Sequence, residues 1–393
     1  MTVRRLRPFS VNVFAAMSEL ATRLDAVNLG QGFPDEDGPP AMLELARQAI
    51  TDGVNQYPPG PGFATLRQAI AAQRARRYRQ HFDPQDGVLV TVGASEGIAA
   101  AILGLIEPGS EVLLIEPFFD TYPPVLALAG VHPVSVPLAS DGNGFALDID
   151  AIRAAITART AAIIINSPHN PTGTVFSDHE LRALAHLAVD ADLLVISDEV
   201  YERLTFDGRE HLPIGNYPGM AERTVTVSSA SKMFNCTGWK IGWACGAPEL
   251  IAGVRAAKQY LSYVNGAPFQ PAVAYALDHE DVWVDGLRDA LQTKRDRLSA
   301  ALNDVGFRTH VSSGTYFVCA DPRGLGFTDG TAFCAELPYL AGVVAIPISA
   351  FCDPDSGTNQ WNHLARFAFC KRDTTLTEAA RRLATMRPPG DAV

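Results

Sequence analysis

The feature that most constrains the fold is an alternation, between residues 87 and 246, of short β-branched runs with helical patterns. Such alternation predicts βα units, whose strands form a mostly parallel sheet flanked by helices. The runs are hydrophobic almost throughout, which indicates strands buried on both faces. We expect strands at residues 87–93, 111–117, 161–166, 192–199 and 224–229, and helices at 95–106, 148–158 and 178–190, with a capping box at 177–180.

A smaller unit is predicted after this sheet. Residues 282–305 have the pattern of one long helix that could link two domains. The other elements expected there are strands at 309–320 and 363–371 and a closing helix at 375–386. We therefore predict an α/β fold: a large domain (38–280) with a mostly parallel sheet flanked by helices, and a smaller α+β domain (281–393) that recruits an N-terminal arm (1–37).

Charge and composition argue against several classes of partner. The chain has 32 Lys and Arg against 43 Asp and Glu, a net charge of −11, without long runs of like charge. Neither nucleic acid nor a membrane surface is therefore expected to bind it. Its longest apolar run, 97–106, is too short to span a bilayer. The six cysteines lack metal-ligand spacing and no signal-like segment follows the basic N-terminus, so we expect free thiols in a cytoplasmic protein.

Polar and aromatic side chains follow the predicted strands, at the sheet edge where open α/β folds bind ligands. The turn at residues 93–97, GASEG, leads into a helix whose free N–H groups suit a phosphate, although such turns are common. The segment 117–122, PFFDTY, brings three aromatic rings, which alone would more often belong to a core. Asn166 and Asn170 lie in a turn that prolines fix.

The last two predicted strands bring charged groups to the same edge. Asp198 ends one of them; its carboxylate either meets a cation or caps a following helix. The next leads to Ser229, Lys232 and Lys240 in a weakly charged stretch, where a lone lysine would most simply lay its stem on apolar surface. One ligand would use all these groups. Pyridoxal 5′-phosphate carries a phosphate, a phenolic oxygen, a ring nitrogen and an aldehyde that an amine attacks.

Four motifs, in this order, resemble those of the class I and II aminotransferases of fold type I. They are NSPHNPTG (166–173), SDEVY (197–201), SSASKMFNCTGWKIGW (228–243) and RFAFCK (366–371). Three more resemble the branch of kynurenine, glutamine, bacterial methionine and N-succinyldiaminopimelate aminotransferases: NLGQGFPDEDGPP (28–40), NQYPPGPG (55–62) and IEPFFDTY (115–122). The resemblance spans roughly residues 10 to 386 and implies an enzyme that uses pyridoxal 5′-phosphate.

The resemblance implies roles around the cofactor ring. Lys232 would bond to the cofactor's aldehyde and, once the substrate releases it, move the proton at the substrate's α-carbon. Asp198 would keep the ring nitrogen protonated, and Phe119 would stack on the ring. Asn170 and Tyr201 would hydrogen-bond the phenolic oxygen.

Further implied roles concern the phosphate. Lys240 resembles the cation that faces it, and Ala94, Ser95 and Ser229 would complete the phosphate site. Tyr57 resembles a tyrosine that reaches the phosphate of a neighbouring subunit. The resemblance thus implies a homodimer with active sites at its interface.

Substrate binding is implied to depend on Arg366, whose forked guanidinium suits the α-carboxylate of an amino acid. Asn166 and the backbone of Gly32 would assist it. The substrates would be small molecules, an L-amino acid and a 2-oxo acid, and no metal is implied.

Overall similarity, including FCDPDSG (351–357) and NHLARFAFCKRD (362–373), favours N-succinyl-LL-2,6-diaminopimelate and 2-oxoglutarate, a pair from lysine biosynthesis. Candidates for a polar distal pocket are Lys258, Tyr260, Tyr263 and Asn265. Kynurenine, methionine and glutamine are alternative donors, for which Phe14, Phe33 and Phe119 could form an aromatic pocket.

Two other functions share the motifs: a cystathionine-type C–S lyase, and a regulator that binds the cofactor without turnover. A departure from the family also bears on the substrate. Glu36 and Asp37 follow GFPD, where kynurenine-type members usually continue with an aromatic residue, so the entrance loop of this chain is expected to differ.

Overall fold

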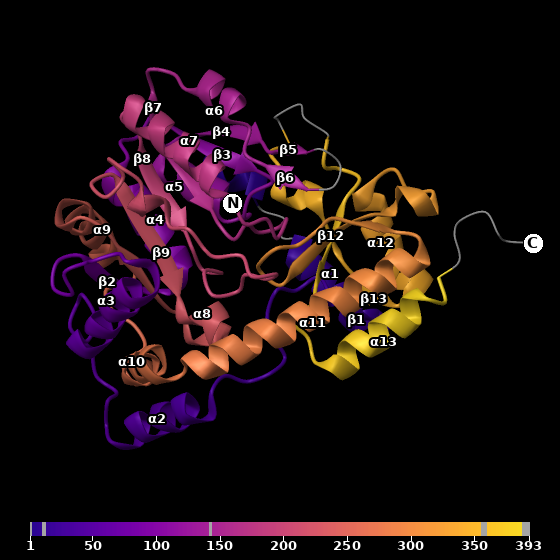
Figure 1. The fold of residues 1–393 in the computed structure, drawn as a ribbon, viewed down its shortest axis with the longest axis horizontal. Helices are drawn as coiled ribbons and strands as arrows, with labels where there is room; N and C mark the ends of the chain where they lie inside the picture. Colours follow the sequence, from indigo (N-terminus) through magenta and orange to yellow (C-terminus); the bar gives the residue numbers. More distant parts are fainter. Residues whose placement is uncertain (1, 10–12, 141–143, 355–359, 387–393) are drawn as a thin grey trace, which may run out of the picture.

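A seven-stranded sheet forms the core of the larger part of the molecule (Figure 1). The computed structural model describes residues 2–9, 13–140, 144–354 and 360–386. The strand order is β2-β10-β9-β8-β7-β3-β4, and neighbours are parallel except where β10 pairs with β2 and β9. The strands are β2 (Val88–Val92), β3 (Glu111–Glu116), β4 (His132–Pro137), β7 (Thr160–Asn166), β8 (Leu194–Asp198), β9 (Thr224–Ser229) and β10 (Ile241–Cys245).

Two strands of this sheet were not predicted. β4 contains Pro133 and Pro137, and proline weakens a strand pattern because it cannot donate to the ladder. An edge strand tolerates proline, and β4 lies at the edge. β10 begins directly after Lys240, whose left-handed backbone (φ 55°) turns the chain into the strand. The first residues of β10 belong to the motif 228–243, which was interpreted as a ligand-binding segment and not as a strand.

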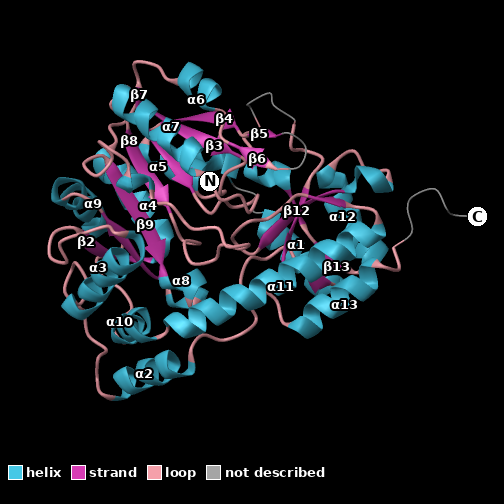
Figure 2. Ribbon diagram, viewed as in Figure 1, coloured by secondary structure: helices cyan, strands magenta, loops and turns pink. Residues whose placement is uncertain are grey.

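Helices cover both faces of the large sheet (Figure 2), as the hydrophobic strands predicted. Successive residues of β3 show the division: Leu114 packs with the helices α4, α5 and α9, whereas Leu113 packs on the opposite face with α6 and α7. The helices and short elements of this part are α2 (Pro40–Thr51), α3 (Ala64–Tyr78), α4 (Gly93–Leu105), α5 (Tyr122–Ala129), β5 (Ala139–Ser140), β6 (Phe145–Ala146), α6 (Ile149–Ala155), α7 (Asp178–Asp190), η2 (Ile214–Asn216), α8 (Ala230–Met233), η3 (Thr237–Trp239), α9 (Pro248–Leu261) and α10 (Phe269–His279). The predicted capping box is present at Ser177 and Glu180.

The smaller part contains a four-stranded antiparallel sheet, β11-β12-β15-β14. The predicted strand at 309–320 is interrupted, because the backbone turns at Thr315 (φ 67°). The elements here are α1 (Val13–Leu24), β1 (Val27–Asn28), α11 (Asp281–Val305), β11 (Arg308–Thr309), β12 (Phe317–Asp321), η4 (Pro322–Leu325), α12 (Gly330–Ala341), β13 (Val343–Val344), β14 (Ile346–Pro347), η5 (Ile348–Phe351), β15 (Ala365–Ala368) and α13 (Asp373–Leu383). The α/β fold class predicted from the sequence is confirmed.

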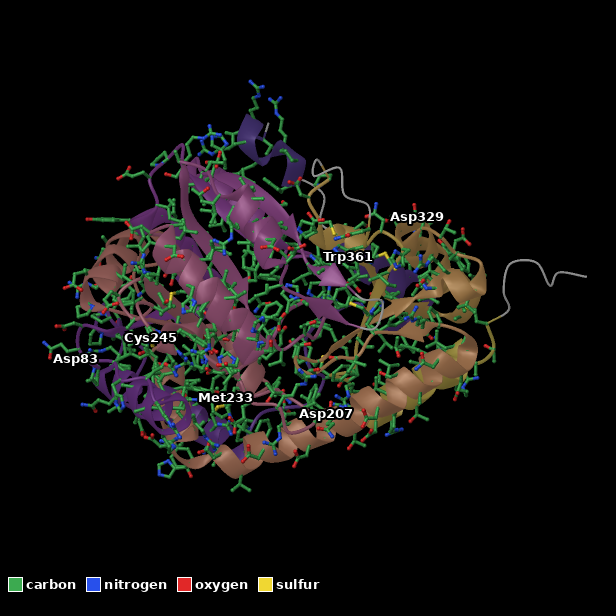
Figure 3. The ribbon with its side chains drawn as sticks, turned by 45° about the horizontal axis from the view of Figure 1, so that its top comes forward. Asp83, Asp207, Met233, Cys245, Asp329 and Trp361 are labelled. Atoms are coloured by element: carbon green, nitrogen blue, oxygen red, sulfur yellow. The ribbon has the colours of Figure 1, made fainter. Side chains whose placement is uncertain are left out.

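Of the N-terminal region, α1 and β1 lie with the small part in space, whereas η1 (Arg4–Phe9) contacts α5 of the large part. β1 pairs in parallel with β13. The helix α11 follows α10 of the large part in the chain and packs beside α13 of the small part (Figure 1). Asp207, labelled in Figure 3, lies beside α11, where Arg295 binds its carboxylate at 2.6 Å. On this basis we propose domain limits at 37/38 and 280/281. No helix among the described residues is both long and apolar enough to cross a membrane.

Candidate active site

A cavity lies at the carboxyl ends of the large sheet's parallel strands, where the sequence pattern placed a ligand site. Its lining includes ten of the predicted site residues: Ala94, Ser95, Phe119, Asn166, Asn170, Asp198, Tyr201, Ser229, Lys232 and Lys240. The last residues of β7, β8 and β9 and the segments that follow β2, β3, β7, β8 and β9 supply them, because parallel strands all end at the same edge. The lining also contains residues that were not predicted: Gly93, Ile98, Val200, Ser231 and Thr237.

One end of this cavity suits an anion. Gly93 has a positive φ of 66°, and a Cβ built on it would lie 3.1 Å from Lys240 Nζ. The absence of a side chain at Gly93 thus lets the first turn of α4 face the ammonium group closely. Ala94 and Ser95 belong to the same turn, and Ser229 ends β9 beside it. Backbone N–H groups, hydroxyls and a cation therefore converge there.

Asp198 is held in the cavity by hydrogen bonds rather than by an ion pair. Its Oδ2 accepts from the Tyr122 hydroxyl at 2.6 Å, and its Oδ1 accepts from the Val200 backbone N–H at 3.3 Å. Burial raises the pKa of Asp198, and the two hydrogen bonds lower it; burial is the larger effect, and the pKa is about 6. The alternative role of Asp198 as a helix cap is wrong, because turns rather than a helix follow it. Sequence reasoning missed Tyr122, although IEPFFDTY contains it.

The residue after Asp198, Glu199, belongs to a buried group with Glu202 and His211. The two carboxylates and the imidazole lie close enough together to suit a metal ion. An arginine occupies this position instead. Arg74, fully buried, pairs with Glu199 at 2.6 Å and also with Glu202. Burial would raise the pKa of Glu199, but Arg74 and His211 outweigh it and lower this pKa to about 2. Arg74 thereby compensates the negative charge next to Asp198.

Lys232 lies in a setting that favours its neutral amine. Burial is the main reason that its pKa falls to about 8, and the charge of Arg366 adds to the effect. Its Nζ lies 3.4 Å from the carbonyl oxygen of Gly32, and 5.8 and 5.4 Å from the ring centroids of Tyr201 and Tyr316. A buried amine with a lowered pKa is suited to nucleophilic and base chemistry.

Arg366, on β15 of the small sheet, is not among the residues that line the cavity, but it contacts Asn170, which lines it. Its side chain is buried and stacks on the ring of Phe317, 3.8 Å from the centroid. Its Nη1 donates to Asn170 Oδ1 and its Nη2 to the Gly30 carbonyl, both at 2.9 Å, whereas Nε has no hydrogen-bond partner among the described residues. Burial lowers the pKa of Arg366 to about 10. A buried guanidinium with an unused donor is suited to binding a carboxylate.

The turn after β7 connects these groups. Asn166 donates to the Asp198 carbonyl at 2.9 Å and accepts from the backbone N–H of Asn170 at 2.7 Å. The side-chain oxygen of Asn170 accepts a hydrogen bond from Arg366. The amide NH₂ group of Asn170 is therefore the part of this side chain that can donate to a ligand. Gly32 lies outside the cavity lining but contacts Lys232, and a Cβ on it would lie 2.4 Å from the Phe317 ring. Only glycine fits there.

This arrangement agrees with the comparison with protein families. The family model for class I and II aminotransferases matches residues 25–383. The chain belongs to the class I and II aminotransferases. Members of this family move an amino group between amino acids and oxo acids and use pyridoxal 5′-phosphate.

Several known aminotransferases are similar to this one over nearly its whole length. A Mycobacterium tuberculosis protein named probable N-succinyldiaminopimelate aminotransferase DapC is 67% identical over 391 residues, 98% of each chain. The solved structure of N-succinyldiaminopimelate aminotransferase from Mycobacterium tuberculosis matches with a TM-score of 0.96 and 68% identity, over 98% of this chain and 99% of that one. Kynurenine–oxoglutarate transaminase 3 of Rattus norvegicus is 37% identical over 402 residues, 96% of this chain and 88% of its own.

Tyr57 lies away from this aminotransferase's own cavity. It is 82% exposed, and its ring packs against that of Tyr263 with centroids 5.7 Å apart. Lys258, expected to offer a cation in a distal pocket, is instead buried. Its ammonium donates to the carbonyls of Gly60 and Tyr263 and so ties the segment that carries Tyr57 to the end of α9.

The entrance loop is attached to the small part of the aminotransferase. Glu36, where the sequence departs from its kynurenine-type relatives, pairs with Lys294 of α11 at 2.6 Å. Asp35 accepts from the Arg372 backbone N–H at 2.6 Å, and Asp37 is exposed. The last residues of FCDPDSG, 355–357, lie outside the described residues.

Proposed function

We propose that this aminotransferase uses N-succinyl-LL-2,6-diaminopimelate as amino donor and 2-oxoglutarate as acceptor. The observation that carries the proposal is the 67% identity with the mycobacterial relative of that name, across 98% of both chains. The kynurenine transaminase of Rattus norvegicus is 37% identical. The cavity groups described above bind what all amino-acid substrates share, so the preference for this donor rests on the similarity.

The donor set of the cavity fits pyridoxal 5′-phosphate. The first turn of α4 at Gly93, with the Lys240 ammonium close to it, suits the phosphate, and Ala94, Ser95 and Ser229 would hold it as well. When bound, the cofactor supplies an electron sink for the charge that develops at the α-carbon of the amino acid.

The remaining residues have distinct tasks in this proposal. Lys232, whose pKa is lowered to about 8, would hold the cofactor at its aldehyde carbon. Once the substrate's amine has displaced it, the freed amine of Lys232 would move the proton at the substrate's α-carbon. Asp198 holds a proton on the ring nitrogen, because an ionised carboxylate accepts from a charged N–H group. Asn170 and Tyr201 donate to the phenolic oxygen, and Phe119 covers a ring face.

The substrate's α-carboxylate is assigned to Arg366. Its unpaired Nε and its position beside Asn170 support this role. Asn166, which lines the cavity, and the backbone of Gly32, whose carbonyl contacts Lys232, would assist at the same carboxylate. Both half-reactions use this contact, since every amino acid and 2-oxo acid carries that carboxylate.

A homodimer completes the proposal. The exposed Tyr57 hydroxyl lies outside its own cavity, and a role at a phosphate requires the cavity of a second copy. Lys258 fixes the loop that presents this tyrosine. We also propose that this enzyme is cytoplasmic.

The test is a comparison of kcat/KM for four donors: N-succinyl-diaminopimelate, kynurenine, methionine and glutamine. We expect the first to be preferred, with glutamate as product from 2-oxoglutarate. A hundredfold preference for kynurenine would overturn the substrate and leave the aminotransferase assignment intact. Pyruvate release from cystathionine without an oxo acid would instead favour a C–S lyase.

A further inference from the structure

We infer that Tyr122 is a positioning residue, which holds the Asp198 carboxylate ionised and correctly oriented for the cofactor's ring nitrogen. The inference rests on the cofactor site proposed above and concerns a residue that has no role in it. Its basis is the 2.6 Å hydrogen bond from the Tyr122 hydroxyl to Asp198 Oδ2. This is a short contact, typical of a hydroxyl that donates to a charged oxygen.

The fold fixes both partners. Tyr122 is the first residue of α5 and is 2% exposed; Asp198 ends β8 and is 4% exposed. The ring of Tyr122 packs edge-on against Phe119, with centroids 5.7 Å apart. The hydroxyl therefore has a defined direction, and the same ring supports the residue proposed to cover the cofactor.

The charges around Asp198 make this hydrogen bond important for keeping its carboxylate ionised. Among the described residues no cation forms an ion pair with Asp198; the charge of Lys232 favours the ionised carboxylate from a longer distance, and the charge of Glu199 disfavours it. The larger effects that favour an ionised Asp198 are its two hydrogen bonds, first that of Tyr122 and then that of the Val200 N–H, which is longer at 3.3 Å. Burial, reinforced by Asp198, raises the pKa of Tyr122 well above its ordinary value, so the phenol remains a donor.

A tyrosine that only fills the core would behave differently. Removing its hydroxyl would lower stability, but it would not change how the protein distinguishes a ring that has a nitrogen from one that lacks it. The experiment therefore measures that distinction. It compares the dissociation constants of pyridoxal 5′-phosphate and of its 1-deaza analogue, in which carbon replaces the ring nitrogen, for the apoenzyme.

We expect wild-type apoenzyme to bind pyridoxal 5′-phosphate more tightly than the analogue. The ratio to compare is the dissociation constant of the analogue divided by that of pyridoxal 5′-phosphate. In Tyr122→Phe this ratio should fall about tenfold or more, which is the scale of a hydrogen bond to a charged group. The matched control is Tyr217→Phe, which deletes a hydroxyl that donates to Asp178 at 2.9 Å, away from the cavity. It should keep the wild-type ratio.

Two further variants repeat the test with smaller side chains: Tyr122→His retains a donor and Tyr122→Leu does not. The histidine variant should keep more of the ratio. A wild-type ratio in Tyr122→Phe, or equal ratios in the His and Leu variants, would overturn the inference and leave the role of Asp198 intact. Equal affinity of the wild-type apoenzyme for both compounds would overturn the role of Asp198 itself.

Discussion

Arg366 and Asn170, 196 positions apart in the sequence, share a hydrogen bond of 2.9 Å between Nη1 and Oδ1. The bond joins β15 of the small sheet to the turn after β7 of the large sheet. It links the residue assigned to the substrate's carboxylate with one assigned to the cofactor's phenolic oxygen. Movement of either sheet would therefore alter both contacts together.

Arg366→Lys is expected to lower kcat/KM by at least about tenfold, because lysine offers a point charge and cannot serve Asn170, Gly30 and a carboxylate in one plane. Steady-state kinetics on donor and acceptor checks this. Arg372→Lys, a change on the exposed surface nearby, is the matched control. Equal kcat/KM in Arg366→Lys and wild type would contradict the carboxylate role.

Lys232→Ala should remove nearly all turnover and all covalent attachment of the cofactor. Loss of general acid–base transfer alone costs about 10²–10⁴-fold. Borohydride reduction followed by mass spectrometry reports the attachment site in the wild type and its loss in the variant. Lys240→Ala should keep the attachment and bind the cofactor more weakly, which separates the two lysines. Turnover of Lys232→Ala within tenfold of wild type would rule out the assignment.

The apoenzyme should react with pyridoxal 5′-phosphate faster as the pH rises towards about 8, the lowered pKa of Lys232, and little faster above it. Only the neutral amine attacks an aldehyde, and burial shifts the loss of its proton down to this range. Stopped-flow absorbance between pH 6 and pH 10 measures the profile. A rate that keeps rising to pH 10 would show a lysine with an ordinary pKa.

Mixed dimers test the contribution of Tyr57. In a dimer of one Lys232→Ala and one Tyr57→Ala subunit, one of the two sites combines an intact Lys232 with the partner's intact Tyr57. Co-refolded variants should therefore be more active than the sum of the separate proteins. Activity equal to that sum, or a fully active monomer in sedimentation at assay concentration, would argue against a shared site.

The sequence by itself determined the parallel part of the large sheet and the residues at its edge. Strands buried on both faces leave a continuous hydrophobic pattern, and the residues directly after each parallel strand must lie at the carboxyl edge. This is why ten of the predicted residues, from Ala94 to Lys240, line one cavity. The strands β4 and β10 escaped prediction, one because of its prolines and one because a motif obscured it.

The tertiary structure alone decided which partners these side chains have. Tyr122 has the same local pattern whether it fills the core or donates to Asp198, 76 positions away. Lys258 offered a cation in the sequence, yet packing buries its ammonium against the carbonyls of Gly60 and Tyr263. Hydrophobic periodicity depends on neighbours along the chain, whereas a hydrogen bond between distant residues depends on how whole elements pack, and that is not encoded within any one segment.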